Sequence, residues 1–100
     1  MSFAELQKKG LGKFLIGDNI DPQKLSIHIS EVEPGNRSHG AHVHTGLEAF
    51  YVFEGQATVE FQGAQYPLNA NESMVIDATV PHGIFNSGTT RTKYMVIITK

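Results

Sequence analysis

The chain has 100 residues, a length that supports one compact domain rather than two. Hydrophobic residues make up 40% of it and the formal net charge is −2, which excludes a disordered chain and a basic surface for nucleic acid. The chain contains no cysteine, so disulfides and thiolate ligands are excluded and any bound metal must be held by nitrogen and oxygen atoms.

The sequence gives no sign of a membrane segment or an export signal. No apolar run reaches the roughly 18 residues that cross a bilayer. The opening residues Met-Ser-Phe-Ala-Glu-Leu also lack the basic and then apolar pattern of a secretory signal. We therefore expect a cytoplasmic protein with neither a membrane nor a nucleic acid as its partner.

The N-terminal ten residues are predicted to form a short helix or flap. Ser2 and Glu5 have the spacing of a capping box, and Gly10 follows as a stop signal. The apolar face of such a helix is small, so we expect it to pack on the main body or on a partner subunit. The predicted division is an N-terminal flap over residues 1–12 and a β-barrel over residues 13–100 of a single domain.

The rest of the chain is predicted to form short strands separated by turn residues such as Asp21-Pro22, Pro34-Gly35 and Gln62-Gly63. Strands of this number and spacing indicate an all-β sandwich, barrel or jelly roll. The predicted strands are Lys13–Ile16, Leu25–Val32, Ala41–His44, Glu48–Glu54, Gln56–Phe61, Gln65–Leu68, Ser73–Ile76, Gly83–Asn86 and Lys93–Thr99.

The strand predicted at Leu25–Val32 alternates apolar and polar residues. Ser26, His28 and Ser30 fall on one side, which is the pattern of a half-buried strand with one face in water.

The strand predicted at Glu48–Glu54 has two apolar faces. Phe50 and Val52 share the face of Glu48 and are expected to point inward, while the opposite face carries other apolar residues. These outward residues are Ala49, Tyr51 and Phe53. An exposed apolar face usually marks an interface, so we expect a two-fold homodimer to which the N-terminal segment contributes.

Three of the five histidines, His39, His42 and His44, stand close together in the sequence. Residues i and i+2 of a strand share a face, so His42 and His44 would point to one position, as two ligands of a metal do. Glu48 follows a turn that contains glycine and can face the same position, and His82 comes much later. The plainer alternative is that these are ordinary surface or core residues.

That alternative is favoured for His28 and His39. A lone histidine in a strand usually has ordinary hydrogen bonds and no metal. His39 is three residues before His42 and would point to the opposite face of a continuous strand, so it is kept only as a reserve ligand.

Three imidazoles and one carboxylate would form a donor set suited to one divalent transition metal. Manganese, iron, cobalt, nickel, copper and zinc all fit such a set, whereas calcium and magnesium prefer oxygen. A metal that prefers six ligands would keep two positions for water, oxygen or a chelating substrate.

The residues from Pro34 to Gly55 resemble the first motif of the cupin family, which reads G, five residues, H-x-H, three or four residues, E, six residues, G. The match is complete from His42 through Gly55, and the leading glycine, Gly35, is one position early. The second motif reads G, five residues, P-x-G, two residues, H, three residues, N.

The second motif is matched in part. His82 and Asn86 are present, while Asn71, Asp77 and Thr79 stand where the family has glycine, proline and glycine. The resemblance implies a cupin-type jelly-roll β-barrel. It also implies the metal ligands His42, His44, Glu48 and His82 and a structural role for Asn86.

The resemblance leaves the reaction open, because small cupins include dioxygenases, isomerases, epimerases, lyases and binding proteins. We expect a metalloenzyme acting on a small oxygen-rich chelating substrate, with Glu48 also serving as general base. The alternatives are a non-catalytic module that binds a small molecule or metal, and a barrel that only mediates association. Residues expected to contact a substrate are Arg37, His39, Phe50, Val52, Met74, Ile76 and Ile84.

Overall fold

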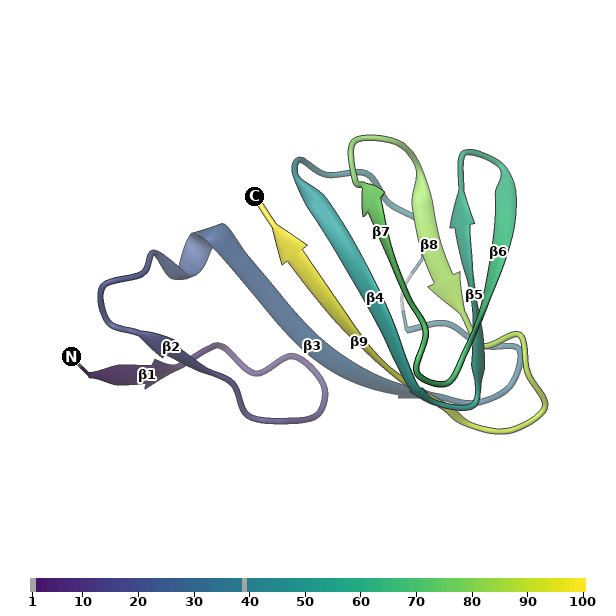
Figure 1. Ribbon diagram of the computed structural model, residues 1–100, viewed down its shortest axis with the longest axis horizontal. Coiled ribbons are helices and arrows are strands. Elements are labelled where there is room, and N and C mark those ends of the chain that lie inside the picture. The colour runs from purple at the N-terminus through teal and green to yellow at the C-terminus, as the bar shows by residue number, and fades with distance from the viewer. Residues whose placement is uncertain (1, 39) are drawn as a thin grey trace.

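The computed structural model describes residues 2–38 and 40–100 (Figure 1). Antiparallel strands dominate these residues, with one 3-10 turn, η1, at Pro22–Lys24. The strands are β1 (Phe3–Glu5), β2 (Leu15–Gly17), β3 (Leu25–Val32), β4 (Leu47–Glu54), β5 (Gln56–Phe61), β6 (Ala64–Asn69), β7 (Ser73–Asp77), β8 (His82–Phe85) and β9 (Thr92–Thr99). Within the described ranges, no helix has the length and apolar character to cross a membrane.

Two antiparallel sheets form the body of the molecule (Figure 1). One sheet has the strand order β3-β9-β4-β7, and the other has the order β6-β5-β8. Their inner faces share one hydrophobic core, which includes Phe50 and Val52 from β4, Val59 from β5, and Tyr94 and Val96 from β9. This all-β arrangement is consistent with the expected jelly-roll barrel.

Residues with left-handed backbone form the tight turns between strands. Gln62 and Gly63 have φ angles of 51° and 77°, the conformation of a two-residue hairpin turn whose twist suits the flanking strands β5 and β6. Asn71, with φ of 68°, turns the chain between β6 and β7, and asparagine tolerates this conformation better than most residues. Turn residues recognised in the sequence therefore set these strand ends.

Strand β3 presents its polar side to the interior of the barrel. Its residues pair directly with β9, so that Ser26 lies opposite Ile98, His28 opposite Val96, and Ser30 opposite Tyr94. Residues directly opposite each other point to the same face, and Val96 and Tyr94 belong to the core. The alternation predicted from the sequence is present, but its polar face lines the barrel and its apolar face points outward.

The N-terminal helix predicted from Ser2 and Glu5 is wrong. Residues 2–17 form an arm in which β1 pairs antiparallel with β2, with Ala4 opposite Ile16. The Leu6 amide donates to the Phe14 carbonyl oxygen over 2.9 Å. In a helix this amide would bond to a carbonyl oxygen four residues earlier, but here it bonds to the other side of the arm. A helix of one or two turns is unstable without packing. The arm lies to the side of the barrel (Figure 1), so the structure has a two-stranded arm in place of the predicted helix or flap.

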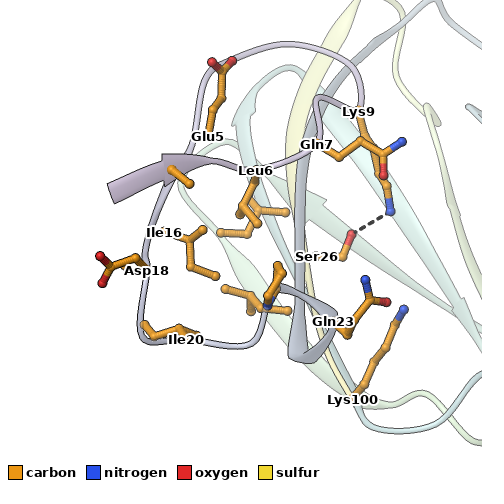
Figure 2. A pocket seen from close by; sticks show the side chains of 15 residues that line it. Glu5, Leu6, Gln7, Lys9, Ile16, Asp18, Ile20, Gln23, Ser26 and Lys100 are labelled. Atoms are coloured by element: carbon orange, nitrogen blue, oxygen red, sulfur yellow. Dashed lines mark hydrogen bonds between the residues drawn. The ribbon is translucent and has the colours of Figure 1, made fainter. Parts of the chain in front are cut away.

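The arm and the start of β3 enclose a pocket of about 550 Å³ (Figure 2). Apolar side chains from the arm, including Leu6 and Ile16, face apolar residues of β3, including Leu25 and Ile27. None of the candidate metal ligands lines this pocket.

Candidate metal centre

His42 and His44 lie in the loop between β3 and β4, not in the predicted strand Ala41–His44. Within this segment the structure has only an isolated antiparallel bridge between His42 and His82. In that bridge the His42 amide donates to the His82 carbonyl oxygen over 3.0 Å, and the His82 amide donates back over 3.2 Å. The His44 amide donates to the Ala78 carbonyl oxygen over 2.9 Å. These bonds fix the two side chains without a regular strand.

Gly46 brings the chain from this loop into β4, where Glu48 is the second residue. The φ of Gly46 is 89°, and a Cβ at this position would overlap the carbonyl oxygen of Thr99. Only glycine fits such a turn without strain. Glu48 then pairs with Ile98 and Ile76 of the neighbouring strands, so its carboxylate points into the barrel, where it is 1% exposed.

His82 is the first residue of β8, and a turn made by Asp77 and Thr79 precedes it. The Asp77 carboxylate accepts bonds from the Thr79 amide over 2.9 Å and from the Thr79 hydroxyl over 2.6 Å. Both bonds lower the pKa of Asp77, and the bond from the Thr79 hydroxyl has the larger effect. Where the cupin motif has proline and glycine, a side-chain turn therefore shapes the approach to His82.

Asn86 holds the loop that follows β8, as the sequence predicts. Its buried amide donates to the carbonyl oxygens of Val32 and Thr90, each over 2.8 Å, and its side-chain oxygen accepts from the Gly88 amide over 2.9 Å. The role of Asn86 is structural, since it ties the end of β3 to the loop after β8.

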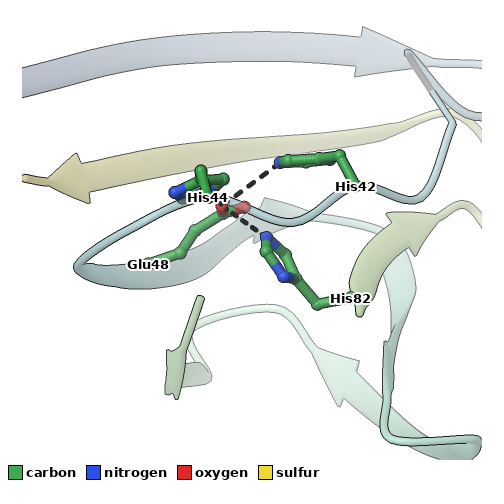
Figure 3. A group of neighbouring side chains, drawn as sticks. All are labelled: His42, His44, Glu48 and His82. Atoms are coloured by element: carbon green, nitrogen blue, oxygen red, sulfur yellow. Dashed lines mark hydrogen bonds and ion pairs between the residues drawn. The ribbon is translucent and has the colours of Figure 1, made fainter. Parts of the chain in front are cut away.

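The side chains of His42, His44, Glu48 and His82 converge on one point (Figure 3). Glu48 Oε1 lies 2.7 Å from His44 Nε2, 2.9 Å from His82 Nε2 and 3.6 Å from His42 Nε2. The candidate ligand atoms all lie within 4.8 Å of one another. Metal–ligand bonds of about 2.1 Å hold neighbouring ligand atoms about 3 Å apart, so small adjustments would place one ion among all four.

The other ring nitrogen of each histidine contacts a backbone carbonyl oxygen. His82 Nδ1 lies 2.8 Å from the Val80 oxygen, His44 Nδ1 lies 3.0 Å from the Thr45 oxygen, and His42 Nδ1 lies 3.3 Å from the Gly40 oxygen. A carbonyl oxygen only accepts, so these contacts favour the tautomer with hydrogen on Nδ1. In a neutral ring of this tautomer, Nε2 presents a lone pair, as metal-binding histidines do.

This arrangement suits a cation between the imidazoles and Glu48. The Nε2 lone pairs of His44 and His82 and the carboxylate of Glu48 are all hydrogen-bond acceptors. Without a cation or a proton between them, their separations of 2.7 and 2.9 Å bring no attraction. Among the described residues, no lysine or arginine forms an ion pair with Glu48. A buried carboxylate without a positive partner is costly. The donor set therefore fits a divalent transition metal of the kind expected from the sequence.

Other residues that the sequence suggested for substrate contact are occupied elsewhere. The Arg37 guanidinium donates to the Glu60 carboxylate over 2.7 Å and stacks on the Phe85 ring. The expected apolar walls Phe50, Val52, Ile76 and Ile84 are buried in the core, and Met74 packs against it. His39 lies outside the described residues. His28 is on the inner face of β3 and is not part of the four-residue cluster.

The sequence matches the family model described as "Cupin domain" over residues 28–98. No curated protein matches the chain. Among solved structures, it is similar to the conserved SPY1581 protein of unknown function from Streptococcus pyogenes, with a TM-score of 0.70 and 19% identity over 78% of this chain and 66% of that one.

Two further solved structures share the fold. A putative sugar phosphate isomerase from Acidithiobacillus ferrooxidans has a TM-score of 0.64 and 29% identity over 77% of this chain and 51% of that one. Iron(II) HppE in complex with substrate has a TM-score of 0.64 and 22% identity over 76% of this chain and 46% of that one. The chain thus spans about half the length of these two proteins. Since the family model covers most of the sequence, including all four clustered residues, the chain belongs to the cupin domain family.

Proposed function

We propose that His42, His44, Glu48 and His82 bind one divalent transition metal in a metal-dependent enzyme for small oxygen-rich substrates. The observation that carries the proposal is the convergence of three imidazole Nε2 atoms on one buried carboxylate, with each Nδ1 at a carbonyl oxygen. When bound, such a metal supplies Lewis acidity toward a chelating substrate, or redox chemistry if it is iron, manganese or copper.

The four side chains differ in their exposure to solvent. The side chains of His82 and Glu48 are 0% and 2% exposed, whereas those of His42 and His44 are 31% and 22% exposed. A substrate would therefore approach over the two loop histidines, while the core holds the other two ligands in place.

Glu48 is proposed to serve also as general base. Its Oε1 atom makes the three imidazole contacts. A carboxylate has a second oxygen, which can take a proton from a substrate held at the same site. Isomerisation of a hydroxy-carbonyl compound needs such a proton transfer, and ring opening by an oxygenase often begins with one. The likeness to a putative sugar phosphate isomerase supports the first reaction class.

Metal analysis is the first test of this function. Protein purified without chelator should contain about one transition metal per chain, and the His44→Ala variant should contain little. Parent protein without metal, or a His44→Ala variant that retains the parent's metal, would contradict the proposal.

A turnover experiment separates an enzyme from a binding module. The metal-loaded protein is incubated with diketones, catechols and acidic sugars, and oxygen consumption and products are followed. Conversion that is lost in the His44→Ala variant supports an enzyme. Binding with full recovery of every compound supports the non-catalytic module instead.

We also propose that the chain assembles as a two-fold homodimer through its larger sheet. An outer patch is formed by Ala49, Tyr51, Val75, Met95 and Ile97, which lie opposite one another on β4, β7 and β9. Val75 is 64% exposed, and a continuous apolar surface of this kind is typical of an interface. The arm carries further exposed apolar side chains, among them Phe3 and Leu15, which are 65% and 60% exposed. It is proposed to pack on the partner, because a two-stranded sheet has little stability of its own.

A further inference from the structure

A second pocket lies along the inner face of β3, two strands away from Glu48 in the same sheet. Its volume is about 460 Å³, which falls within the range of small-molecule sites. Apart from Ile98, the side chains that line it are polar or charged. They are Lys9, Ser26, His28, Ser30 and Ser38.

The sheet register connects this pocket to the metal centre. Ser26 lies opposite Ile98 on β9, and Ile98 lies opposite Glu48 on β4. Adjacent strands are about 4.8 Å apart, so the Ser26 and Glu48 backbones are about 10 Å apart with both side chains pointing inward. A molecule held at the centre by one end can therefore reach the serines with the other.

The hydroxyl groups of the pocket are held in defined positions. The Ser38 hydroxyl and the Tyr94 hydroxyl are hydrogen-bonded over 3.0 Å, and Ser30 lies opposite Tyr94 in the register. Burial raises the pKa of Tyr94, and hydrogen bonds from Ser38 and Ser30 partly oppose this effect. The phenol therefore stays neutral, and although it is buried and does not line the pocket, it orients the hydroxyl groups of Ser38 and Ser30 that do.

A positive charge also lines the pocket. The Lys9 ammonium, which comes from the arm, donates to the Ser26 hydroxyl over 3.2 Å (Figure 2). An ammonium beside a hydroxyl recognises a carboxylate or phosphate together with a neighbouring hydroxyl group of a ligand.

We propose that this pocket binds the tail of an anionic polyol, a short carbon chain with several hydroxyl groups and a terminal carboxylate or phosphate, whose other end chelates the metal. The inference rests on the proposed function, because the metal holds the reacting end. The polar inner face of β3 carries it: Ser26 and Ser30 lie on the same face as the core residues Tyr94 and Val96, and hydroxyl groups inside a barrel match the hydroxyl groups of a ligand.

Calorimetry on the zinc-loaded chain tests the ligand class, since zinc has no redox chemistry and cannot oxidise the probes. The probes are gluconate, ribose 5-phosphate, sorbitol and salicylate, an aromatic chelator that has no polyol chain. Gluconate or ribose 5-phosphate should bind most tightly, and the tighter of the two identifies the anionic group. Salicylate binding at least as tightly as both, or no polyol binding at all, would overturn the inference.

Two variants test the pocket residues. Combined Ser26→Ala and Ser30→Ala substitution should weaken binding of the preferred probe about tenfold, from the loss of two hydrogen bonds. Ser73→Ala is the matched control, because Ser73 is an exposed strand serine on the opposite face. Lys9→Gln should reduce the affinity for the anionic probe toward that for sorbitol, and Lys8→Gln should not. If the double serine variant and Lys9→Gln both bind the probe as tightly as the parent, the proposal that this pocket binds the ligand is overturned.

Zinc content measured on the same samples separates this inference from the proposed function. None of the pocket residues is a candidate ligand, so serine-dependent binding by a chain that takes up no zinc would support the pocket and contradict the metal function. If the chain takes up zinc but the serine substitutions do not change probe binding, the metal function is supported and the pocket is contradicted.

Discussion

Replacing Glu48 by glutamine should stabilise the metal-free protein and remove its stabilisation by metal. In the parent, the carboxylate oxygen lies 2.7 and 2.9 Å from two imidazole nitrogens that present lone pairs. A glutamine amide has two N–H donors for these nitrogens. Each new hydrogen bond contributes about 1 kcal/mol, so the expected gain is about 1–2 kcal/mol. For a domain of this size, each kcal/mol raises the melting temperature by about 4–8 °C.

Thermal melting at pH 8, with and without zinc, measures both effects. Zinc at about 100 times its dissociation constant should stabilise the parent by about 2.7 kcal/mol and the Glu48→Gln variant by far less. Glu54→Gln is the matched control, because Glu54 is an exposed carboxylate at the end of the same strand. The reasoning is refuted if metal-free Glu48→Gln melts below the parent, or if zinc raises both melting temperatures equally.

Three further predictions concern the frame around the site and the assembly. Asn86→Ala should lower the free energy of unfolding by about 2–4 kcal/mol, since three hydrogen bonds of a buried amide are lost. Urea denaturation measures this change, and a loss below about 1 kcal/mol would contradict the structural role of Asn86 in tying β3 to the loop after β8. Metal content should fall as the pH is lowered, because protons compete for imidazole nitrogen; equal content at pH 7.5 and pH 4.5 after dialysis would contradict the ligand set. Light scattering at micromolar concentration should give a dimeric mass for the parent and a monomeric mass for Ile97→Lys; a monomeric parent would rule out the dimer.

Local sequence signals predicted most strands but not which way β3 faces. Gln56–Phe61 and Leu25–Val32 have the predicted bounds, because turn residues flank them. Alternation shows which side chains share a face, but pairing with β9 decides which face is inside. That register depends on residues at the other end of the chain, so Ser26 and Ser30 could not be recognised as pocket residues.

The N-terminal helix failed for a related reason. The spacing of Ser2 and Glu5 is a local signal, and hydrogen bonds to residues as far along as Asp18 outweigh it.

The candidate ligands were found from their spacing, although the local structure assumed for them was wrong. His42 and His44 were expected to converge because they alternate in a strand. They converge because backbone bonds to Ala78 and His82 fix an irregular loop. Motif spacing therefore carried information that the predicted secondary structure did not.

The backbone bridge between His42 and His82 bears on when the site forms during folding. The bridge joins the loop after β3 to the start of β8, and β3 itself pairs with β9, so that Leu25 lies opposite Thr99. Contacts between residues so far apart in sequence form slowly, typically in milliseconds to seconds for β-barrels. We predict that the ligand cluster is assembled late, after the transition state for folding. A bound metal should accordingly slow unfolding and leave the folding rate almost unchanged.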